Sequence, residues 1–284
     1  MTTCTLDSQR HIHLYNDHNT NPTTSEKSKT LAFFGAGGDC AGYCLANSLK
    51  AGYTCRALAR APSKLLDSLK KKGVPQATID TNLTIIQGDV KNLDNVKSTL
   101  HTASGLPVEV IISGIGGTPN FQVSLTQPLG MTEPNICNSA GSTILRAASE
   151  PHLQHTEHSK PLLVNISTTG IPAPGAPWDV PCALSPLYRW GLHVPHEDKA
   201  KLEEKLREEV RLSSCGIKGY VNIKPSLLFD GESKGLQAVK QGVDEKPAIG
   251  NSIHRQDVGL FIFEHFVKGE VVDEWINKSL TITY

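Results

Sequence analysis

The 284-residue sequence predicts an α/β fold in which helices cover both faces of a doubly wound parallel sheet. From Thr30 onward, short strand-like runs alternate with helix-like stretches, which is the pattern of parallel strands joined by crossover helices. Two runs, "VEVIISG" and "PLLVNIS", are almost continuously apolar, as expected for strands covered on both faces. A glycine-rich segment separates the first strand from the first helix. Together these features favour a single domain over residues 30–284.

The expected elements follow in order. Strands are expected at 31–34, 54–58, 83–87, 108–113, 162–167, 218–223 and 280–284. Helices are expected at 39–51, 63–72, 92–102, 135–148, 196–212 and 255–267. Three long connections, at 118–134, 168–186 and 226–247, interrupt the alternation. The first two follow strand ends, where open α/β sheets bind ligands. We expect the three together to roof a substrate pocket.

Composition excludes several classes of protein. Lys plus Arg and Asp plus Glu number 28 each, so no net charge favours nucleic acid or an anionic membrane. No apolar run approaches the roughly 20 residues that span a bilayer. The seven cysteines lack metal-ligand spacing, which favours a reducing, cytoplasmic location. Residues 1–29 are polar without an apolar core, which predicts a flexible tail and no secretory signal.

The segment "GAGGDCAG" predicts a nucleotide-binding turn. Gly35 permits a tight turn, Gly38 allows close backbone approach, and Ala41 lets the helix pack near the sheet. A pyrophosphate at the helix N-terminus would then face the backbone of Gly35, Gly37, Gly38, Asp39 and Cys40. The spacing is not the strict G-x-G-x-x-G, and Asp39 brings a negative charge close to the phosphate. The alternative is a plain structural turn.

The second strand indicates which dinucleotide binds. NAD-binding proteins usually carry an acid near its end, about 20 residues past the glycines, to hold the ribose 2′-hydroxyl. Here "ALARAPSKL" places Arg60, Ser63 and Lys64 in this region, which suits the 2′-phosphate of NADP. A solvated basic corner is the alternative. The predicted cofactor is therefore NADP(H).

The next two strands end in residues that could face the same cofactor. In "IIQGDV", Asp89 could accept a hydrogen bond from the adenine amino group, with Val90 beside it. In "ISGIGG", the backbone of Gly114 and Ile115 would let the ribose approach closely. Either segment could instead be a sharp turn.

The sequence resembles the atypical short-chain dehydrogenase/reductases, in particular the NmrA-like NAD(P)-binding proteins and the small fungal reductases of the averufin-oxidase kind. The resemblance covers nearly everything after Thr30, through "FFGAGGDCAGYCLANSLKAGY", "ALARAPSKL", "IIQGDV", "HVPHEDK", "IKPSLLFDGE" and "IHRQDVG". It implies a Rossmann core that binds NADP and a small substrate lobe, built here from about 168–195 and 225–284. It also implies that Pro225 and Leu227 lie at the nicotinamide end. Lys224 stands where the family more often has Arg, a change that the sequence does not explain.

The sequence departs from that family at the proton-transfer residues. Standard members use Ser followed by Tyr-x-x-x-Lys, and Ser167 occupies the place of the serine. The expected helix region lacks Tyr-x-x-x-Lys, because Leu192 lies four residues after Tyr188 and Pro195 lies four before Lys199. The usual route of proton transfer therefore cannot be assumed here.

Several side chains in this region are candidates to take over proton transfer from the absent tyrosine and lysine. His193 and His196 flank a proline-fixed turn, and histidine transfers protons well near neutral pH. Tyr188 is a second candidate donor, Lys199 could hold the nicotinamide ribose, and Ser167 could stabilise a developing oxyanion. The alternatives are a histidine that only caps or packs, and a tyrosine that packs beside Trp190.

Other polar clusters have plainer interpretations. Glu197 and Asp198 are expected to be favourable charges in a first helical turn, and "KAKLEEKLREEVR" is expected to be a solvated face. The triplet His152, His155 and His158 follows Pro151 in a polar context, so a surface connection and no metal site are expected.

The leading hypothesis is an NADPH-dependent oxidoreductase that reduces a carbonyl or quinone of a small aromatic or polyketide-like metabolite. One alternative is an isomerase, epimerase or cyclase of the same fold that uses NADP(H) without net redox. Another is an NmrA-like regulator that senses NADP. The long loops over the expected pocket favour an enzyme. No nucleic-acid or membrane partner is expected, and the oligomeric state is left open.

Overall fold

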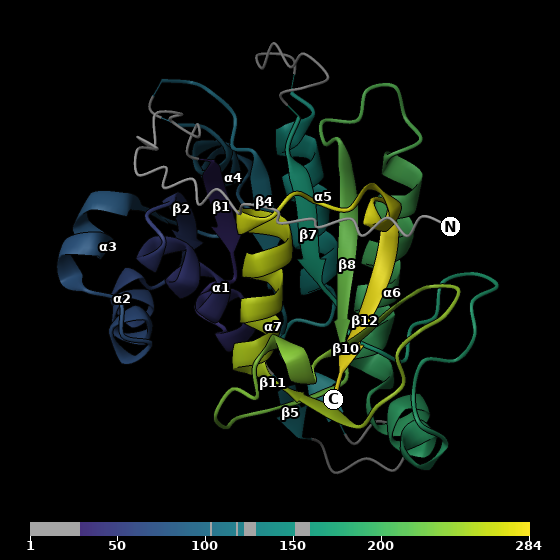
Figure 1. Cartoon of the computed structure of the whole chain (residues 1–284). Coiled ribbons are helices and arrows are strands. Elements are labelled where there is room, and N and C mark those ends of the chain that lie inside the picture. The colour runs from purple at the N-terminus through teal and green to yellow at the C-terminus, as the bar shows by residue number, and fades with distance from the viewer. Residues whose placement is uncertain (1–28, 103, 118, 122–128, 151–159) are drawn as a thin grey trace, which may run out of the picture.

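The protein, seen here in a computed structural model, is described over residues 29–102, 104–117, 119–121, 129–150 and 160–284 (Figure 1). An eight-stranded sheet with the order β10-β12-β8-β7-β4-β1-β2-β3 forms its centre. Every neighbouring pair is parallel except β10 and β12. The strands are β1 Thr30–Phe34, β2 Thr54–Ala59, β3 Leu83–Gln87, β4 Val110–Ser113, β7 Leu162–Ile166, β8 Gly219–Pro225, β10 Lys240–Val243 and β12 Lys278–Thr283.

Helices cover both faces of this sheet (Figure 1). One face carries α1 Asp39–Lys50, α2 Pro62–Lys71, α3 Gln76–Asn82 and α7 Arg255–Ile262. The other carries α4 Leu93–Leu100, α5 Ile136–Ala148 and α6 His193–Glu209. The expected doubly wound α/β sheet is confirmed.

Two apolar cores result from the alternation of side chains along the strands. In β1, Leu31 and Phe33 belong to the core under α1 and α7, whereas Ala32 and Phe34 belong to the core under α4 and α5. All four side chains are fully buried. Burial on both faces explains why the central strands are apolar runs with no polar alternation.

The direction of strand succession reverses next to β1. From β1 the chain moves to β2 and β3 on one side, then to β4 and β7 on the other. Ligands of open α/β sheets bind outside the carboxyl ends of the strands at such a switch point. The functional site is therefore expected above β1 and β4.

Most expected elements occur with small shifts at their ends, but two helices differ. Helix α6 begins at His193 and not at His196, and Pro195 fits in its first turn because no intrahelical partner is needed there. The helix expected at 255–267 is α7 followed by a π-helical turn, Phe263–Lys268.

The long connections hold elements that the sequence did not predict. Strands β5 Pro119–Phe121 and β6 Leu129–Met131 pair in the first connection, while β9 Leu227–Phe229 pairs with β11 Ser252–His254. The prediction of one continuous loop over 226–247 is wrong, because β9 and β10 both lie in it. Residues 1–28 and the histidine triplet lie outside the described residues, and the division into core and substrate lobe stays a prediction.

Candidate functional site

A cleft of about 470 Å³ lies over the carboxyl ends of β1 to β4. It brings together most of the predicted cofactor residues, from four segments of the chain. These are Gly35, Gly37, Gly38, Arg60, Lys64, Asp89, Val90, Gly114 and Ile115. Asp39 and Cys40 line an adjoining cavity instead. The structure thus places these residues along one continuous surface.

The floor of this cleft is made of backbone. Gly35 has φ +74°, and a Cβ there would lie 2.7 Å from the carbonyl carbon and oxygen of Gly114. A Cβ on Gly114 would in turn lie 2.6 Å from the Cβ of Ala41. Gly38, the N-cap of α1, provides no side-chain cap. The first N–H groups of α1 are therefore available to an anion, and the glycine cradle fits a dinucleotide pyrophosphate.

Asp39 is paired with a lysine beside the helix. Lys72 donates to the Asp39 carboxylate over 2.9 Å and also lies 4.7 Å from the centre of the Tyr43 ring. The Lys72 side chain is only 7% exposed. The positive charge of Lys72 offsets the negative charge of Asp39, which lies close to the expected phosphate. Asp39 is therefore compatible with an anion at the N-terminus of α1.

The rim of the cleft carries exposed charges around Glu133. Arg60 Nη1 lies 3.4 Å from Glu133 Oε1, and Lys91 donates to the other oxygen of the same carboxylate. The hydrogen bond to Glu133 raises the pKa of Lys91. No sequence pattern indicated Glu133, which precedes α5 in one of the long connections. Arg60 is thus paired with the Glu133 carboxylate, whereas the sequence predicted that it binds the 2′-phosphate of NADP.

A second cavity of about 320 Å³ continues from the first past the N-terminus of α1. It brings together Ser167, Tyr188 and Lys199, which the sequence predicted as catalytic residues, with Pro225, which was predicted at the nicotinamide end. Arg255, at the start of α7, also lines it and was not predicted. Burial raises the pKa of the Cys40 thiol to about 12, so this side chain stays neutral and poorly nucleophilic.

The predicted proton donors differ in their surroundings. Neither His193 nor His196 is among the described residues that line this cavity. The His196 ring lies 5.4 Å from the Tyr188 ring, and burial lowers the pKa of His196 to about 4. Burial raises the pKa of Tyr188, whose hydroxyl accepts from Thr169 Oγ1 over 3.2 Å. Lys199 Nζ donates to the Ile166 carbonyl over 2.8 Å.

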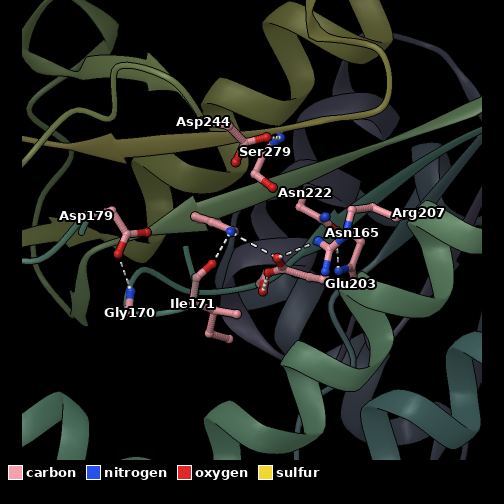
Figure 2. A network of polar contacts seen from close by, with 11 residues as sticks. Asn165, Gly170, Ile171, Asp179, Glu203, Arg207, Asn222, Asp244 and Ser279 are labelled. Carbon is pink, nitrogen blue, oxygen red and sulfur yellow. Dashed lines mark hydrogen bonds and ion pairs between the residues drawn. The ribbon is translucent and has the colours of Figure 1, made fainter. Parts of the chain in front are cut away.

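Glu203 lies in a buried network of polar contacts between α6 and the sheet (Figure 2). Ser167 Oγ donates to Glu203 Oε1 over 2.5 Å, and Lys224 Nζ lies 2.9 Å from Glu203 Oε2. Both charged side chains are 1% exposed. Lys224 also donates to the Ile171 carbonyl. The solvated face predicted for this part of α6 is therefore wrong at Glu203, which turns toward the sheet.

Asp198 also departs from its predicted role. It is buried and accepts hydrogen bonds from the backbone N–H groups of Cys137 and Asn138, over 2.7 and 3.0 Å. Asn135, the N-cap of α5, makes no such bond. Asp198 therefore caps α5 from α6, where the sequence predicted only a favourable charge for its own helix.

The comparisons with known proteins agree with this geometry. The family model described as NAD(P)H-binding matches residues 35–267. The chain belongs to the NAD(P)H-binding family. It is 42% identical over 272 residues to "Reductase pytE" of Aspergillus terreus, covering 92% of this chain and 100% of that protein. It is 34% identical over 282 residues to "Oxidase pynE" of Aspergillus niger, covering 89% and 98%.

Solved structures with the same fold are more distant in sequence. An anaerobillin reductase, ChuY of Escherichia coli O157:H7, aligns with TM-score 0.58 and 16% identity over 89% of this chain and 96% of its own. The oxidoreductase ylbE of Lactococcus lactis aligns with TM-score 0.56 and 18% identity, over 89% and 90%. These two likenesses concern the fold alone. Family membership and the two fungal relatives identify this NAD(P)H-binding protein as an oxidoreductase.

Two features are absent from the part of the chain that the structure describes. None of their helices is both long and apolar enough to cross a membrane. No cluster of three or more His, Cys, Asp or Glu side chains among them is arranged to hold a metal ion.

Proposed function

We propose that this NAD(P)H-binding protein is an NADPH-dependent reductase of a carbonyl or quinone on a small aromatic or polyketide-like molecule. The observation that carries the choice of NADPH is the rim of the cleft. Arg60 and Lys64 line it at the end of β2, where NAD-binding proteins usually have an acid. A guanidinium and an ammonium suit a phosphate better than a ribose hydroxyl.

The choice of substrate class is supported by the second cavity. Its lining combines apolar side chains such as Leu192, Leu227 and Leu228 with the polar groups of Ser167 and Tyr188. A volume of about 320 Å³ suits a small ring system. The two fungal relatives are named as a reductase and an oxidase, which supports redox chemistry on a small molecule.

In this proposal, residues of the first cleft bind the cofactor, and residues of the second cavity contact the substrate. The N–H groups at the start of α1 bind the pyrophosphate, while Arg60 and Lys64 bind the 2′-phosphate. Bound NADPH supplies a hydride. Pro225 and the backbone near Gly114 limit the position of the nicotinamide end. Ser167 faces the substrate oxygen, with Tyr188 and Lys199 beside it in the same cavity.

Cofactor titrations test the choice of NADPH. Nicotinamide fluorescence would be followed with NADPH and with NADH, in the wild type, Arg60→Ala and the matched control Lys70→Ala. Lys70 is exposed on the same helix as Lys64 but is not among the described lining residues of the cleft. We expect tighter binding of NADPH and loss of most of this preference in Arg60→Ala alone. Equal affinities for both cofactors in the wild type would contradict the proposal.

Consumption of NADPH tests the reaction class. With 9,10-phenanthrenequinone as a probe, we expect oxidation of NADPH in step with reduction of the quinone. An isomerase, epimerase or cyclase would convert its substrate without net loss of NADPH. A regulator would bind NADP⁺ and NADPH with different affinities and turn over no substrate. Either outcome would replace the reductase proposal.

A further inference from the structure

Ser167 connects the second cavity with the buried carboxyl group of Glu203. Ser167 lies just after β7 and lines the cavity, while its hydroxyl donates to Glu203 Oε1 over 2.5 Å. Glu203 lies on α6, one turn after Lys199, with its side chain 1% exposed. A titratable group with no direct access to solvent is therefore one hydrogen bond away from the cavity.

Charged groups from two elements surround this carboxyl group (Figure 2). Lys224 of β8 lies 2.9 Å from Oε2, and Arg207 of α6 lies 4.0 Å from the same oxygen. Tyr220 of β8 is near enough for Glu203 to raise its pKa further. Asp179 interacts with Lys224 from the connection after β7, and Asp244 interacts with Tyr220. The two cations are placed to stabilise Glu203 whenever it is ionised.

The other candidate donors are less suited to give up a proton here. Lys199 Nζ is engaged with the Ile166 carbonyl, and the low pKa of His196 leaves its ring neutral near neutral pH. Burial raises the pKa of Tyr188, and Leu192 stands four residues later, where a lysine would lower that pKa. Burial also raises the pKa of Glu203, because it disfavours the ionised form by more than Lys224 and the Ser167 hydrogen bond favour it. A carboxylic acid with a raised pKa is suited to act as a general acid.

We propose that Glu203 supplies the proton of the reduction through Ser167, so that this pair replaces the missing tyrosine and lysine. The inference rests on the proposed reductase function. For this step the Ser167 hydroxyl turns from Glu203 to the substrate oxygen, and the protonated Glu203 carboxyl group donates to Oγ. When hydride reaches the carbonyl carbon, the substrate oxygen takes the proton of Ser167 Oγ. The same Oγ takes the proton of the Glu203 carboxyl group. Glu203 is left as a carboxylate beside the Lys224 ammonium, and water entering after product release returns the proton by the same path.

In this scheme Glu203 acts through Ser167 and does not touch the substrate. Lys224 holds the carboxyl group in place and compensates its charge after transfer. A purely structural role would require only that the network stay packed. The two roles differ in their dependence on pH, because only a relay must gain and lose a proton during turnover.

A pH profile of the reaction distinguishes these roles. NADPH oxidation with 9,10-phenanthrenequinone would be compared in the wild type, Ser167→Ala, Glu203→Gln and the control Glu204→Gln, whose side chain is exposed on the same helix. We expect the wild-type rate to fall as pH rises and Glu203 ionises. Glu203→Gln should lose roughly 100- to 10,000-fold in rate together with that alkaline limb. NADPH affinity and the Glu204→Gln profile should be unchanged. An unaltered alkaline limb in Glu203→Gln would overturn the relay.

An infrared titration tests the same relay without turnover. The protonated carboxyl band would be recorded against pH in the wild type, Glu203→Gln and Glu203→Gln/Lys224→Met, which keeps the buried site free of an unpaired charge. We expect a band that titrates in the wild type and is missing from both variants. Its absence from the wild type across the neutral range would overturn the relay. If NADPH binds but no probe is reduced, the proposed function fails, and the infrared result still decides whether Glu203 exchanges a proton.

Discussion

The cleft over β1 to β4, called here the cofactor cavity, and the second cavity, called here the substrate cavity, are lined by different kinds of groups. Backbone forms the floor of the cofactor cavity, where Gly35 and Gly114 meet without side chains, and its charged groups lie exposed at the rim. Buried charged side chains support the substrate cavity, where Glu203 and Lys224 are each 1% exposed. We infer that substitutions behind the substrate cavity affect stability strongly, whereas those at the cofactor rim affect affinity alone.

The largest expected effect concerns Lys224. Lys224→Met leaves the Glu203 carboxyl group buried without its cation, which should lower the free energy of unfolding by about 3–5 kcal/mol at a pH where Glu203 is ionised. Glu203→Gln/Lys224→Met removes both charges and should recover most of this loss. Urea unfolding monitored by circular dichroism measures both. A double variant as unstable as Lys224→Met would show that packing, and not the unpaired charge, is responsible.

The next effect is a pH dependence due to His196. Its pKa is about 4 in the folded protein, below the value of about 6.5 expected when unfolded. The unfolded chain therefore binds the proton first as pH falls, so the stabilising contribution present above pH about 6.5 is lost on acidification toward pH 4, by about 3 kcal/mol. His196→Phe should flatten this part of the stability profile. The exposed His193, changed to Gln, is the control and should leave it intact.

A smaller effect is expected at the floor of the cofactor cavity. Gly35→Ala forces a side chain into the left-handed region and against the backbone of Gly114, which should reduce stability by roughly 1–3 kcal/mol. Gly37→Ala is the matched control, because its Cβ would meet nothing within 4 Å. Thermal unfolding of both variants without cofactor compares them. Equal melting temperatures would mean that the turn can relax around a methyl group.

The smallest effect is expected at the rim. Glu133→Gln removes the carboxylate that binds Arg60 and Lys91, so both cations become available to the 2′-phosphate. NADPH affinity should rise by roughly two- to fivefold, and the gain should shrink at high salt because the groups are exposed. NADH affinity should stay the same. A gain for both cofactors alike would place the effect of Glu133 somewhere other than the 2′-phosphate.

The contrast between the cavities also explains what the sequence could predict. The glycine turn lies within eight consecutive residues, and its function depends on backbone conformation, so spacing alone indicates it. The central strands were predicted because burial on both faces makes them apolar runs. Short strands such as β9 and β11 have three residues each and depend on each other for pairing. No local pattern therefore marks them.

The charged network escaped prediction for a related reason. Glu203 follows Lys199 and Lys201 in a helix whose composition is that of a solvated surface, and its partner Ser167 is 36 residues away. Only the packing of α6 against β7 and β8 shows which of its acids face the sheet. Asp198 is similar, since its buried partners belong to α5. Sequence reasoning placed Ser167 in the site but could not identify the residue behind it.

The bare floor of the cofactor cavity limits how this protein can change its cofactor. The backbones of Gly35 and Gly114 meet there and the Ala41 methyl group fills the remaining space. No side chain at this point can therefore be varied to change cofactor preference. Exposed residues such as Arg60, Lys64 and Glu133 can be replaced without disturbing either core. A change of cofactor preference from NADPH to NADH should therefore begin with substitutions at the end of β2 and leave the glycine turn before α1 unchanged.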